Sequence, residues 1–311
     1  MTREPPLVVL LTALGESATT RLRSVAEVVG APSVERLTAE ERRRCRVVVL
    51  RSETTLGARE LAELPALTDV VRPGSGVDNI AVDVLRTRGI ALHRNADASA
   101  DAVAELAVTG LTVLCRRMGL GHRWLLEGSF AKQRLMGESV AALSTVIWGA
   151  GPIGRAVYRR LRAGGHRADF VRHPSVPDGL PVLAEEEALA EADVHVLALP
   201  LRPRTRGIVD ADWLGRASGR RPYLVNVGRH ELLDPDAVAR ALCDGRLRGC
   251  YLDPLDASQS ATIARFLETT RDCNVFATQH QGAQRSDIRG VLDAWVVETV
   301  RQRLHEGPGA N

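Results

Sequence analysis

The sequence predicts a parallel α/β protein with two domains, and three observations support this prediction. Short apolar runs of strand length alternate with amphipathic helical patterns over most of the 311 residues. This length corresponds to two domains at roughly 150 residues each. A glycine-rich loop joins an apolar strand to a helix in the second half, as in doubly wound folds. Hydrophobic residues make up 45% of the chain and charged residues 25%, a balance that excludes a largely disordered protein.

The first half of the chain contains compact apolar runs that predict strands at residues 7–11, 46–50 and 69–71. Amphipathic patterns predict helices between these strands, over residues 20–29 and 57–64. Strands that alternate with helices in this way are typical of a parallel sheet, because parallel neighbours need crossover connections.

A long helix is predicted next, over residues 99–118, because apolar side chains such as Val103, Leu106 and Leu114 recur at helical spacing. The polar, glycine-containing residues 119–137 are predicted to form a connector with some helix.

A second α/β series follows this connector. Strands are predicted at residues 145–148, 168–171, 194–199, 223–226, 249–252 and 275–278. Helices are predicted at residues 153–163, 235–243 and 286–304. Asp234 is the expected N-cap of the second of these helices, with Pro235 at its first helical position.

The net charge does not indicate nucleic-acid binding, since 41 basic and 38 acidic side chains leave a formal net charge of only +3. Lys132 is the only lysine, so nearly all positive charges are arginines. An arginine therefore indicates a functional role only through its position in the sequence. We predict testable roles for Arg51, Arg72, Arg172 and Arg229, and expect the other arginines to be solvated.

Five cysteines are scattered along the chain, at positions 45, 115, 243, 250 and 273, without a C-x-x-C pair. They predict reduced thiols in a cytoplasmic protein, with neither a disulfide framework nor a zinc site or other metal. No segment approaches 18 uninterrupted apolar residues, so we expect no membrane partner.

The strongest local motif is Gly149-Ala-Gly-Pro-Ile-Gly154, which follows a predicted strand and opens a predicted helix. In a dinucleotide site Gly149 permits the tight turn, Gly151 lets the backbone approach the pyrophosphate, and Gly154 allows close helix–strand packing. Pro152 and Ile153 begin the helix, whose free N–H groups favour phosphate. The alternative interpretation is a tight turn that binds nothing.

The end of the next strand bears on the choice of cofactor. An acid there would bind the ribose hydroxyls of NAD, but Arg172 and His173 occupy the place. Because a guanidinium binds a 2′-phosphate that a carboxylate would repel, NADPH is favoured over NADH. Asp169 is the competing acid, although strand alternation places it inside the strand. Alternatively, Arg172 is one more solvated arginine.

Segments on both sides of the loop resemble the D-isomer-specific 2-hydroxyacid dehydrogenase family, in its phosphoglycerate dehydrogenase-like branch. The matching segments begin at Arg51-Ser-Glu-Thr, Arg72-Pro-Gly-Ser-Gly-Val-Asp-Asn, Asn95, Val103-Ala-Glu, Leu135-Met-Gly, Leu199-Pro-Leu-Arg-Pro, Asn226-Val-Gly-Arg, Leu252-Asp and Thr278-Gln-His. The resemblance implies a Rossmann cofactor domain at residues 98–283, inserted in a flavodoxin-like substrate domain formed by residues 1–97 and 284–311. It also implies an active site in the interdomain cleft and a homodimer.

The resemblance also implies hydride transfer between a nicotinamide and a 2-oxo or 2-hydroxy acid. Arg229 matches the arginine that binds the substrate carboxylate and polarises the carbonyl, and His280 matches the proton donor. The alternatives are a structural salt bridge and a surface histidine. Backbone amides of Ser75, Gly76 and Val77 would hold the carboxylate. Further cofactor contacts are expected from Pro200, Thr205, Val227, Gly228 and Asp253.

One departure from the family concerns the partner of the histidine. The family has a glutamate five residues after the aspartate that Asp253 matches, and this position is Ser258. Asp256 and Gln259 are the other candidates, and we assign Asp256 to the catalytic set. An ionised partner would keep His280 a competent acid near neutral pH. Loss of the glutamate keeps open a second interpretation, a cofactor-binding regulatory or corepressor-like protein.

Arg51 and Arg72 bear on the chemistry of the substrate at the end far from its carboxylate, because they match arginines that face this end in the phosphoglycerate branch. With Lys132 or Arg134 they would suit a second anionic group such as phosphate, phosphonate or carboxylate. The alternative is that both are ordinary surface arginines. Gln279 and Gln281 flank His280 and predict an unusually polar pocket.

Overall fold

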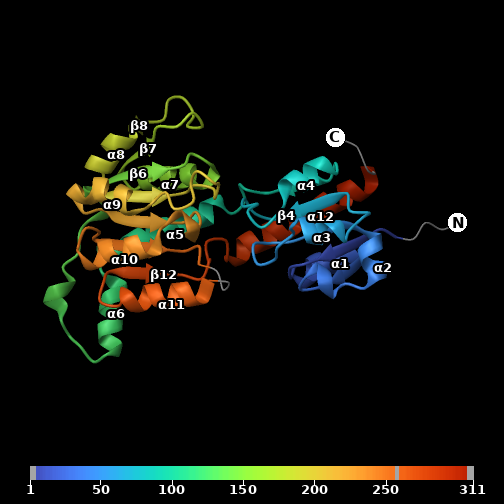
Figure 1. Cartoon of the computed structure of the whole chain (residues 1–311), viewed down its shortest axis with the longest axis horizontal. Helices are drawn as coiled ribbons and strands as arrows, with labels where there is room; N and C mark the ends of the chain where they lie inside the picture. The colour runs from blue at the N-terminus through green and yellow to red at the C-terminus, as the bar shows by residue number, and fades with distance from the viewer. Residues whose placement is uncertain (1–4, 256–258, 307–311) are drawn as a thin grey trace. The chain divides into compact units, whose positions relative to one another are not determined.

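The computed structural model describes residues 5–255 and 259–306. It contains two compact units, which are described separately (Figure 1). Unit 1 comprises Met1–Ser99 and Gln284–Asn311, and unit 2 comprises Ala100–Ala283. The chain therefore passes between the units after residues 99 and 283, where the sequence placed the two boundaries after residues 97 and 283.

Unit 1 contains a five-stranded parallel sheet in the order β2-β1-β3-β4-β5, which is the flavodoxin-like order. Its strands are β1 (Leu7–Leu10), β2 (Glu27–Gly30), β3 (Cys45–Val49), β4 (Asp69–Arg72) and β5 (Ala91–Arg94). The central strands β1, β3 and β4 are buried over most of their length because helices cover both faces.

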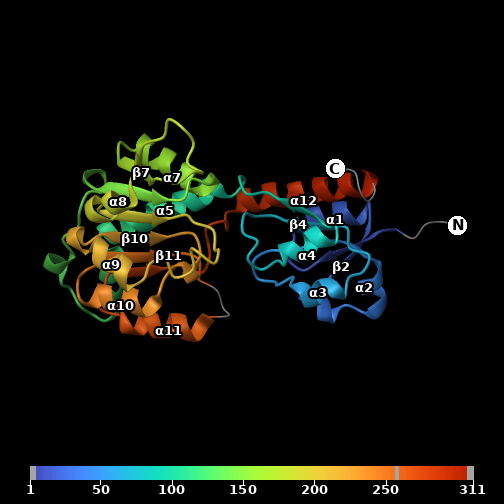
Figure 2. The ribbon, with the colours of Figure 1, turned by 45° about the horizontal axis from the view of Figure 1, so that its top comes forward.

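Helices lie on both faces of this sheet (Figure 2). Each face carries a separate apolar core. One core receives side chains from α1 (Glu16–Arg23) and α12 (Ser286–Glu306). The other receives Val34, Leu61 and Leu85, from η1 (Val34–Arg36), α3 (Ala58–Ala62) and α4 (Val82–Thr87). The short helix α2 (Ala39–Arg44) precedes β3.

The helix predicted over residues 20–29 is wrong in its second half. Helix α1 begins at Glu16 and ends at Arg23, and residues 27–30 pair with β1 as strand β2. The β-branched pair Val28 and Val29 packs well on a pleated sheet, so strand pairing overrides the amphipathic pattern there.

Unit 2 contains a seven-stranded parallel sheet in the order β12-β11-β10-β9-β6-β7-β8, a Rossmann order extended by one strand. Its strands are β6 (Ser144–Trp148), β7 (Arg167–Val171), β8 (Val182–Leu183), β9 (Val194–Leu197), β10 (Tyr223–Asn226), β11 (Gly249–Leu252) and β12 (Val275–Ala277). The strand order reverses between β6 and β9, the point where ligands bind in such sheets.

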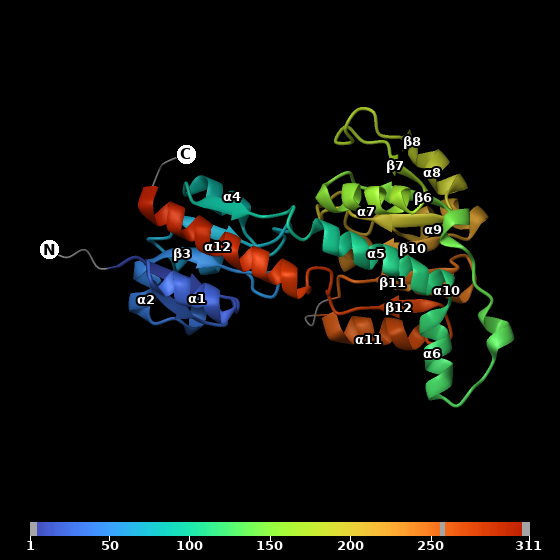
Figure 3. The ribbon, with the colours of Figure 1, turned by 180° about the vertical axis from the view of Figure 1, so that it is seen from behind.

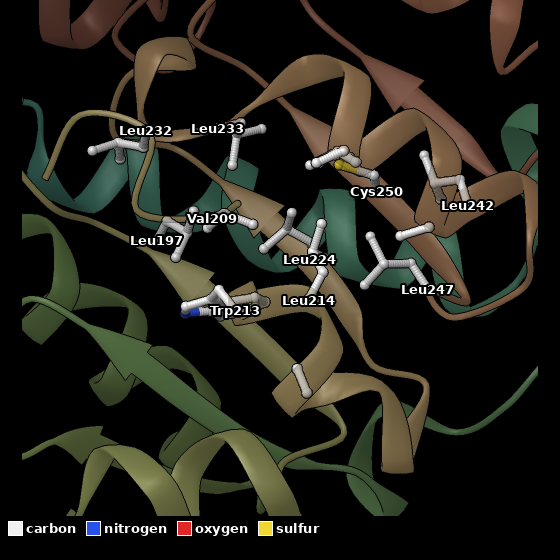
Figure 4. Packing of buried hydrophobic residues seen from close by; sticks show 14 of the residues in the cluster. Leu197, Val209, Trp213, Leu214, Leu224, Leu232, Leu233, Leu242, Leu247 and Cys250 are labelled. Carbon is white, nitrogen blue, oxygen red and sulfur yellow. The ribbon is translucent and has the colours of Figure 1, made fainter. Parts of the chain in front are cut away.

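Helices cover both faces of this sheet (Figures 1 and 4). One face packs against α5 (Ala100–Cys115) and α7 (Pro152–Ala163). The other packs against α8 (Glu185–Glu191), α9 (Ala211–Ala217), α10 (Pro235–Cys243) and α11 (Ser260–Thr269). The short helical turns η4 (Ser218–Arg220) and η5 (His230–Leu232) lie in loops.

The helix predicted over residues 99–118 ends earlier, at Cys115. Arg117 adopts a left-handed backbone conformation with φ of 51°, and α6 (Met118–Leu126) then starts in a new direction. The connector continues through the short turns η2 (Lys132–Leu135) and η3 (Val140–Ala142), and Figure 3 shows it at the edge of unit 2.

Two arginines contradict the prediction that those without an assigned role are solvated. The guanidinium of Arg303 binds the buried carboxylate of Asp69 at 2.8 Å. Arg248 contacts Asp193 at 3.2 Å and also binds Glu138. Both arginines connect elements that are distant in sequence, which position within a motif did not indicate.

Among the helices of the described residues, none combines the length and the apolar character needed to cross a bilayer.

Candidate active site

The glycine-rich loop follows β6 and needs glycine at two positions for steric reasons. Gly149 has φ of 107°, a region that side chains rarely adopt, and a Cβ there would lie 2.7 Å from the Ala198 carbonyl oxygen. A Cβ on Gly154 would collide with the Gly149 carbonyl oxygen. The loop is therefore folded tightly between β6 and α7.

Gly151 differs from these two glycines, since a Cβ there would meet no heavy atom of the described residues within 4 Å. It is the N-cap of α7, and Pro152 occupies the first helical position. The amino end of α7 thus presents free N–H groups beside open space, at the point where the strand order reverses. This geometry fits the pyrophosphate of a dinucleotide.

The end of β7 presents the residues predicted to select the cofactor. Arg172 and His173 are both exposed, while the Arg172 amide donates to the Leu183 carbonyl at 2.8 Å and fixes the backbone. His173 Nδ1 lies 2.7 Å from Ser175 Oγ. Asp169 lies inside β7, as strand alternation predicted.

Arg229 lies in a turn after β10 that the buried amide of Asn226 holds from both sides. Asn226 Oδ1 accepts a hydrogen bond from the Gly228 amide at 3.0 Å, and Asn226 Nδ2 donates to the Arg229 carbonyl at 2.7 Å. The Val227 amide donates to the Leu197 carbonyl, which attaches the turn to β9. Arg229 itself is half-buried.

His280 lies in a turn after β12 that the carboxylate of Asp253 organises. Asp253 Oδ1 accepts from the Thr278 hydroxyl at 2.7 Å and from the Gln281 amide at 2.8 Å, and Oδ2 accepts from the Gly282 amide at 3.1 Å. The His280 amide donates to the Asp253 carbonyl at 2.7 Å. His280 has φ of 54°, an uncommon conformation that these contacts maintain.

Arg229, Asp253 and His280 follow three neighbouring strands, β10, β11 and β12. Backbone hydrogen bonds join the segments, from Asp253 to the Asn226 carbonyl and from Thr278 to the Leu252 carbonyl. The structure thus brings the predicted arginine and histidine to one edge of one sheet. Asp256 and Ser258 lie outside the described residues, and Gln259 is the N-cap of α11.

Two predicted cofactor residues have roles within the chain. Asp253 is only 2% exposed, and both of its oxygens accept protein hydrogen bonds. The Thr205 hydroxyl donates to the Pro200 carbonyl at 2.8 Å and accepts from the Arg202 amide at 2.8 Å, which closes the turn after β9. Their direct contact with a cofactor stays a prediction.

In unit 1, the residues 75–77 predicted to bind carboxylate form a half-buried bend after β4. Within the described residues, the amides of Ser75, Gly76 and Val77 donate no hydrogen bond, whereas the Ser75 carbonyl accepts one from Arg94 at 3.2 Å. Half-buried amides without an acceptor are suited to an anion.

The two arginines predicted to bind a distal anion are buried within the same unit. Arg51 is 7% exposed, and its guanidinium contacts Asp293 of α12 at 3.1 Å. Burial, together with the nearby Arg289, lowers the pKa of Arg51. Arg72 is 5% exposed and donates to the Pro73 carbonyl. Both differ from ordinary surface arginines, although a substrate contact stays a prediction.

The side chains expected to assist these arginines lie in unit 2. Lys132 is exposed in η2, and Arg134 lies over the Trp124 ring, with its guanidinium carbon 4.8 Å from the ring centre. Gln279 and Gln281 are exposed on either side of His280, so the surroundings of this histidine are polar.

The sequence analysis assigned no role to Asn226, Thr278 or Asp293. For Asn226 a signal was present, since an amide that ends the apolar run Tyr-Leu-Val-Asn must be satisfied once the strand is buried. The pairing of Asp293 with Arg51 spans 242 positions and left no signal of this kind.

A family model for the NAD-binding domain of D-isomer specific 2-hydroxyacid dehydrogenases matches residues 108–282. The chain belongs to this family. The match covers the glycine loop, Arg229 and His280, which are the features that the geometry of unit 2 brings to the carboxyl edge of its sheet.

Relatives of the family carry several names. The (S)-sulfolactate dehydrogenase of Chromohalobacter salexigens is 32% identical over 266 residues, covering 83% of this chain and 84% of that protein. The D-3-phosphoglycerate dehydrogenase of Mycobacterium tuberculosis is 28% identical over 308 residues, covering 96% of this chain. This chain spans only 57% of the length of that relative.

The fold is also that of a solved D-lactate dehydrogenase from Aquifex aeolicus in complex with NAD and lactic acid. The TM-score is 0.85 at 18% identity, and the match covers 98% of this chain and 100% of the other. At this identity the likeness extends to the fold alone.

Proposed function

We propose that the protein is an NADPH-dependent reductase of a 2-oxo acid that carries a second anionic group. The observation that supports this most is the position of Arg229 after β10 and of His280 after β12, on either side of β11, in the sheet whose glycine loop fits a dinucleotide. Membership of a 2-hydroxyacid dehydrogenase family supports the reaction class.

The chain's own residues have separate tasks in this reaction. The amides of residues 75–77 bind the substrate carboxylate, as an anion-binding nest does. Arg229 polarises the 2-oxo group with its guanidinium, and His280 donates a proton to the oxygen as the alkoxide forms. The glycine loop after β6 would hold a nicotinamide dinucleotide, which would supply the hydride. Asn226 and Asp253 hold the two turns in position.

The preference for NADPH rests on Arg172 and His173, which are exposed at the end of β7 where an NAD-binding acid would lie. We expect Arg172→Ala to weaken NADPH binding at least tenfold and to leave NADH binding within about twofold. Arg167→Ala is the matched control, because Arg167 is exposed at the opposite end of the same strand. Unchanged NADPH affinity in Arg172→Ala would contradict the preference.

The proposal that the substrate carries a second anionic group is based on Arg51 and Arg72 and on the names of two relatives. Phosphoglycerate and sulfolactate, which appear in the names of those relatives, each carry an acidic group in addition to the carboxylate. We expect kcat/KM for 3-phosphohydroxypyruvate or sulfopyruvate to exceed that for pyruvate, and Arg72→Gln to reduce this preference about tenfold. Equal values for all three substrates would contradict a distal anion site.

We also propose a homodimer formed through α6 and the connector that follows it. These elements carry large exposed apolar side chains, with Leu126 at 76%, Phe130 at 85% and Met136 at 80% exposure. Light scattering would give twice the chain mass, and the double substitution Leu126→Asp/Phe130→Asp would give a monomer. Val291→Asp is the control, since Val291 is an exposed apolar residue of α12 in unit 1.

NADPH oxidation with a panel of 2-oxo acids tests the main proposal. We expect turnover in the wild-type protein and its loss in Arg229→Ala and His280→Ala. Tight NADPH binding without turnover on any substrate would favour the cofactor-binding regulatory protein instead. A cytoplasmic location remains part of the proposal, supported by five cysteines that are all free thiols.

A further inference from the structure

Two cysteines that are 30 positions apart in the chain lie side by side in unit 2. Cys243 is the last residue of α10, and Cys273 lies in the turn before β12. Their sulfur atoms are 3.8 Å apart. The other cysteines, Cys45, Cys115 and Cys250, are buried. The pair is thus set apart from the other thiols by both proximity and access.

The two thiols differ in exposure, which gives them different chemical roles. Cys243 is exposed, and its sulfur lies 3.7 Å from the Thr269 carbonyl oxygen. Cys273 is half-buried, and burial with the nearby Cys243 raises its pKa to about 11. An oxidant from solution therefore meets Cys243 first, with Cys273 already in contact behind it.

The geometry needs little change for the two sulfur atoms to bond. A disulfide has a sulfur–sulfur distance of about 2.05 Å, so the two sulfur atoms must approach from 3.8 Å to this distance. Cys243 is the last residue of its helix and Cys273 lies outside any helix or strand, so both side chains can turn without disrupting regular structure.

We propose that Cys243 and Cys273 form a reversible thiol-oxidation site that hydrogen peroxide converts to an intramolecular disulfide. The Cys243 thiol first releases its proton to solvent. Its thiolate then attacks one oxygen of hydrogen peroxide, the O–O bond breaks, and the leaving hydroxide takes a proton from solvent, which gives a sulfenic acid and one water. The Cys273 sulfur then attacks the Cys243 sulfur, the S–O bond breaks, and a second water leaves with the remaining proton. The thiols lose two electrons and one peroxide is reduced.

The site lies away from the candidate catalytic residues. Cys243 precedes β11 and Cys273 precedes β12, at the amino edge of the sheet, whereas Arg229 and His280 follow the carboxyl ends of strands. The disulfide would nevertheless close a loop that contains Asp253, which organises the His280 turn. We therefore expect oxidation to stabilise unit 2 and Cys243→Ser to leave turnover of the reduced protein unchanged.

Peptide mapping of the full chain tests the site. The reduced protein is treated with hydrogen peroxide at low molar excess, and its intact mass should fall by about 2 Da. Non-reducing digestion should link the peptides of Cys243 and Cys273, with the three buried cysteines unmodified, and dithiothreitol should reverse the link. The melting temperature should rise by about 5 °C on oxidation. Cys243→Ser and Cys273→Ser should show neither the link nor the rise.

Differential alkylation of the wild-type protein gives a second measurement that depends on no variant. Both thiols should lose reactivity together on oxidation and regain it together on reduction. Oxidation of Cys243 to sulfinic acid without a cross-link would overturn the proposal, and so would a disulfide between two chains. A link to another cysteine would also overturn it.

Discussion

Arginines follow strands in both sheets, but the two sheets use them differently. Arg51 follows β3 of unit 1, is 7% exposed, and contacts Asp293 at 3.1 Å. Arg229 follows β10 of unit 2, is half-buried, and lies in a turn that Asn226 holds by its backbone. In the first case a carboxylate on another element holds the side chain, whereas in the second Asn226 holds the backbone and the guanidinium donates to the adjacent Gly228 carbonyl at 2.8 Å.

This difference separates Arg51, whose charge stabilises the fold of unit 1 whatever it contributes to the distal anion site, from Arg229, to which we assign catalysis alone. A buried guanidinium with a carboxylate partner supports the packing of α12 on the sheet of unit 1, and removing that partner leaves a costly charge. A rigid backbone fixes the position from which the guanidinium of Arg229 would meet a substrate. The predictions below would break or sharpen this contrast, in order of decreasing effect.

Substitution of Arg229 should have the largest effect, and it should act on catalysis. We expect Arg229→Ala to lower kcat/KM about 1,000-fold, because the polarising charge on the carbonyl is lost. Arg229→Lys should recover only part of this, since an ammonium lacks the planar fork. Steady-state kinetics and thermal unfolding of both variants check this prediction. A loss of stability that accompanies the loss of activity would contradict the distinction between Arg229 and Arg51.

Substitution of Asp293 should act on stability. Asp293→Ala leaves Arg51 buried without its counter-ion, so the free energy of unfolding should fall by about 3 kcal/mol. The double substitution Arg51→Met/Asp293→Leu should recover most of the loss, because an apolar pair of similar volume replaces the ion pair. Urea unfolding measures both, and a stable Asp293→Ala protein would show that Arg51 does not need this partner.

The ion pairs around Asp69 in unit 1 predict that the stability of the protein depends on pH. Burial opposes the charged form of Asp69, but hydrogen bonds from His93, Thr68 and Arg303 outweigh burial and lower its pKa to about 2. Because this pKa lies below the unfolded value near 3.8, the stabilisation is present above about pH 4 and is lost as pH falls towards 2.

The expected size of this contribution is about 2 kcal/mol. Asp69→Asn should therefore unfold more easily than wild type at pH 7, and the two proteins should converge as the pH falls from 4 towards 2. Urea titrations at several pH values measure the difference. A gap that stays constant over this range would contradict the role of the Asp69 charge.

Asn226 should show the smallest effect, as a residue that positions Arg229. We expect Asn226→Ala to lower kcat/KM about tenfold and to weaken NADPH binding less than this, because the turn with Val227, Gly228 and Arg229 loosens but the glycine loop is untouched. Asn226→Asp keeps the acceptor for the Gly228 amide and should be intermediate. If stability fell and catalysis did not, Asn226 would be structural only.

The sequence predicted the parts of the molecule that depend on local patterns. The glycine loop was predicted from steric needs that the structure confirms at Gly149 and Gly154. The Asp234 side chain accepts from the amides of Asp236 and Ala237 at the start of α10, as its capping position indicated. Such features are set by neighbours a few positions away, so a single sequence contains them.

The remainder depends on contacts between distant residues. Nothing near Arg51 indicates Asp293, and nothing near His280 indicates that the Asp253 carboxylate holds its turn. Val28 and Val29 became a strand because β1 was available to pair with them. Pairing partners of this kind are decided by the tertiary fold, and a local pattern cannot identify them.

Hydride transfer itself gives the most direct test of the central claim. The protein is supplied with NADPH deuterated at the transferable C4 position and with the best 2-oxo acid of the panel, and the product is analysed by mass spectrometry. We predict a 2-hydroxy acid that carries one deuterium on C2, formed by wild type and not by Arg229→Ala. Formation of no labelled 2-hydroxy acid, from any 2-oxo acid tested and with NADPH bound, would contradict it.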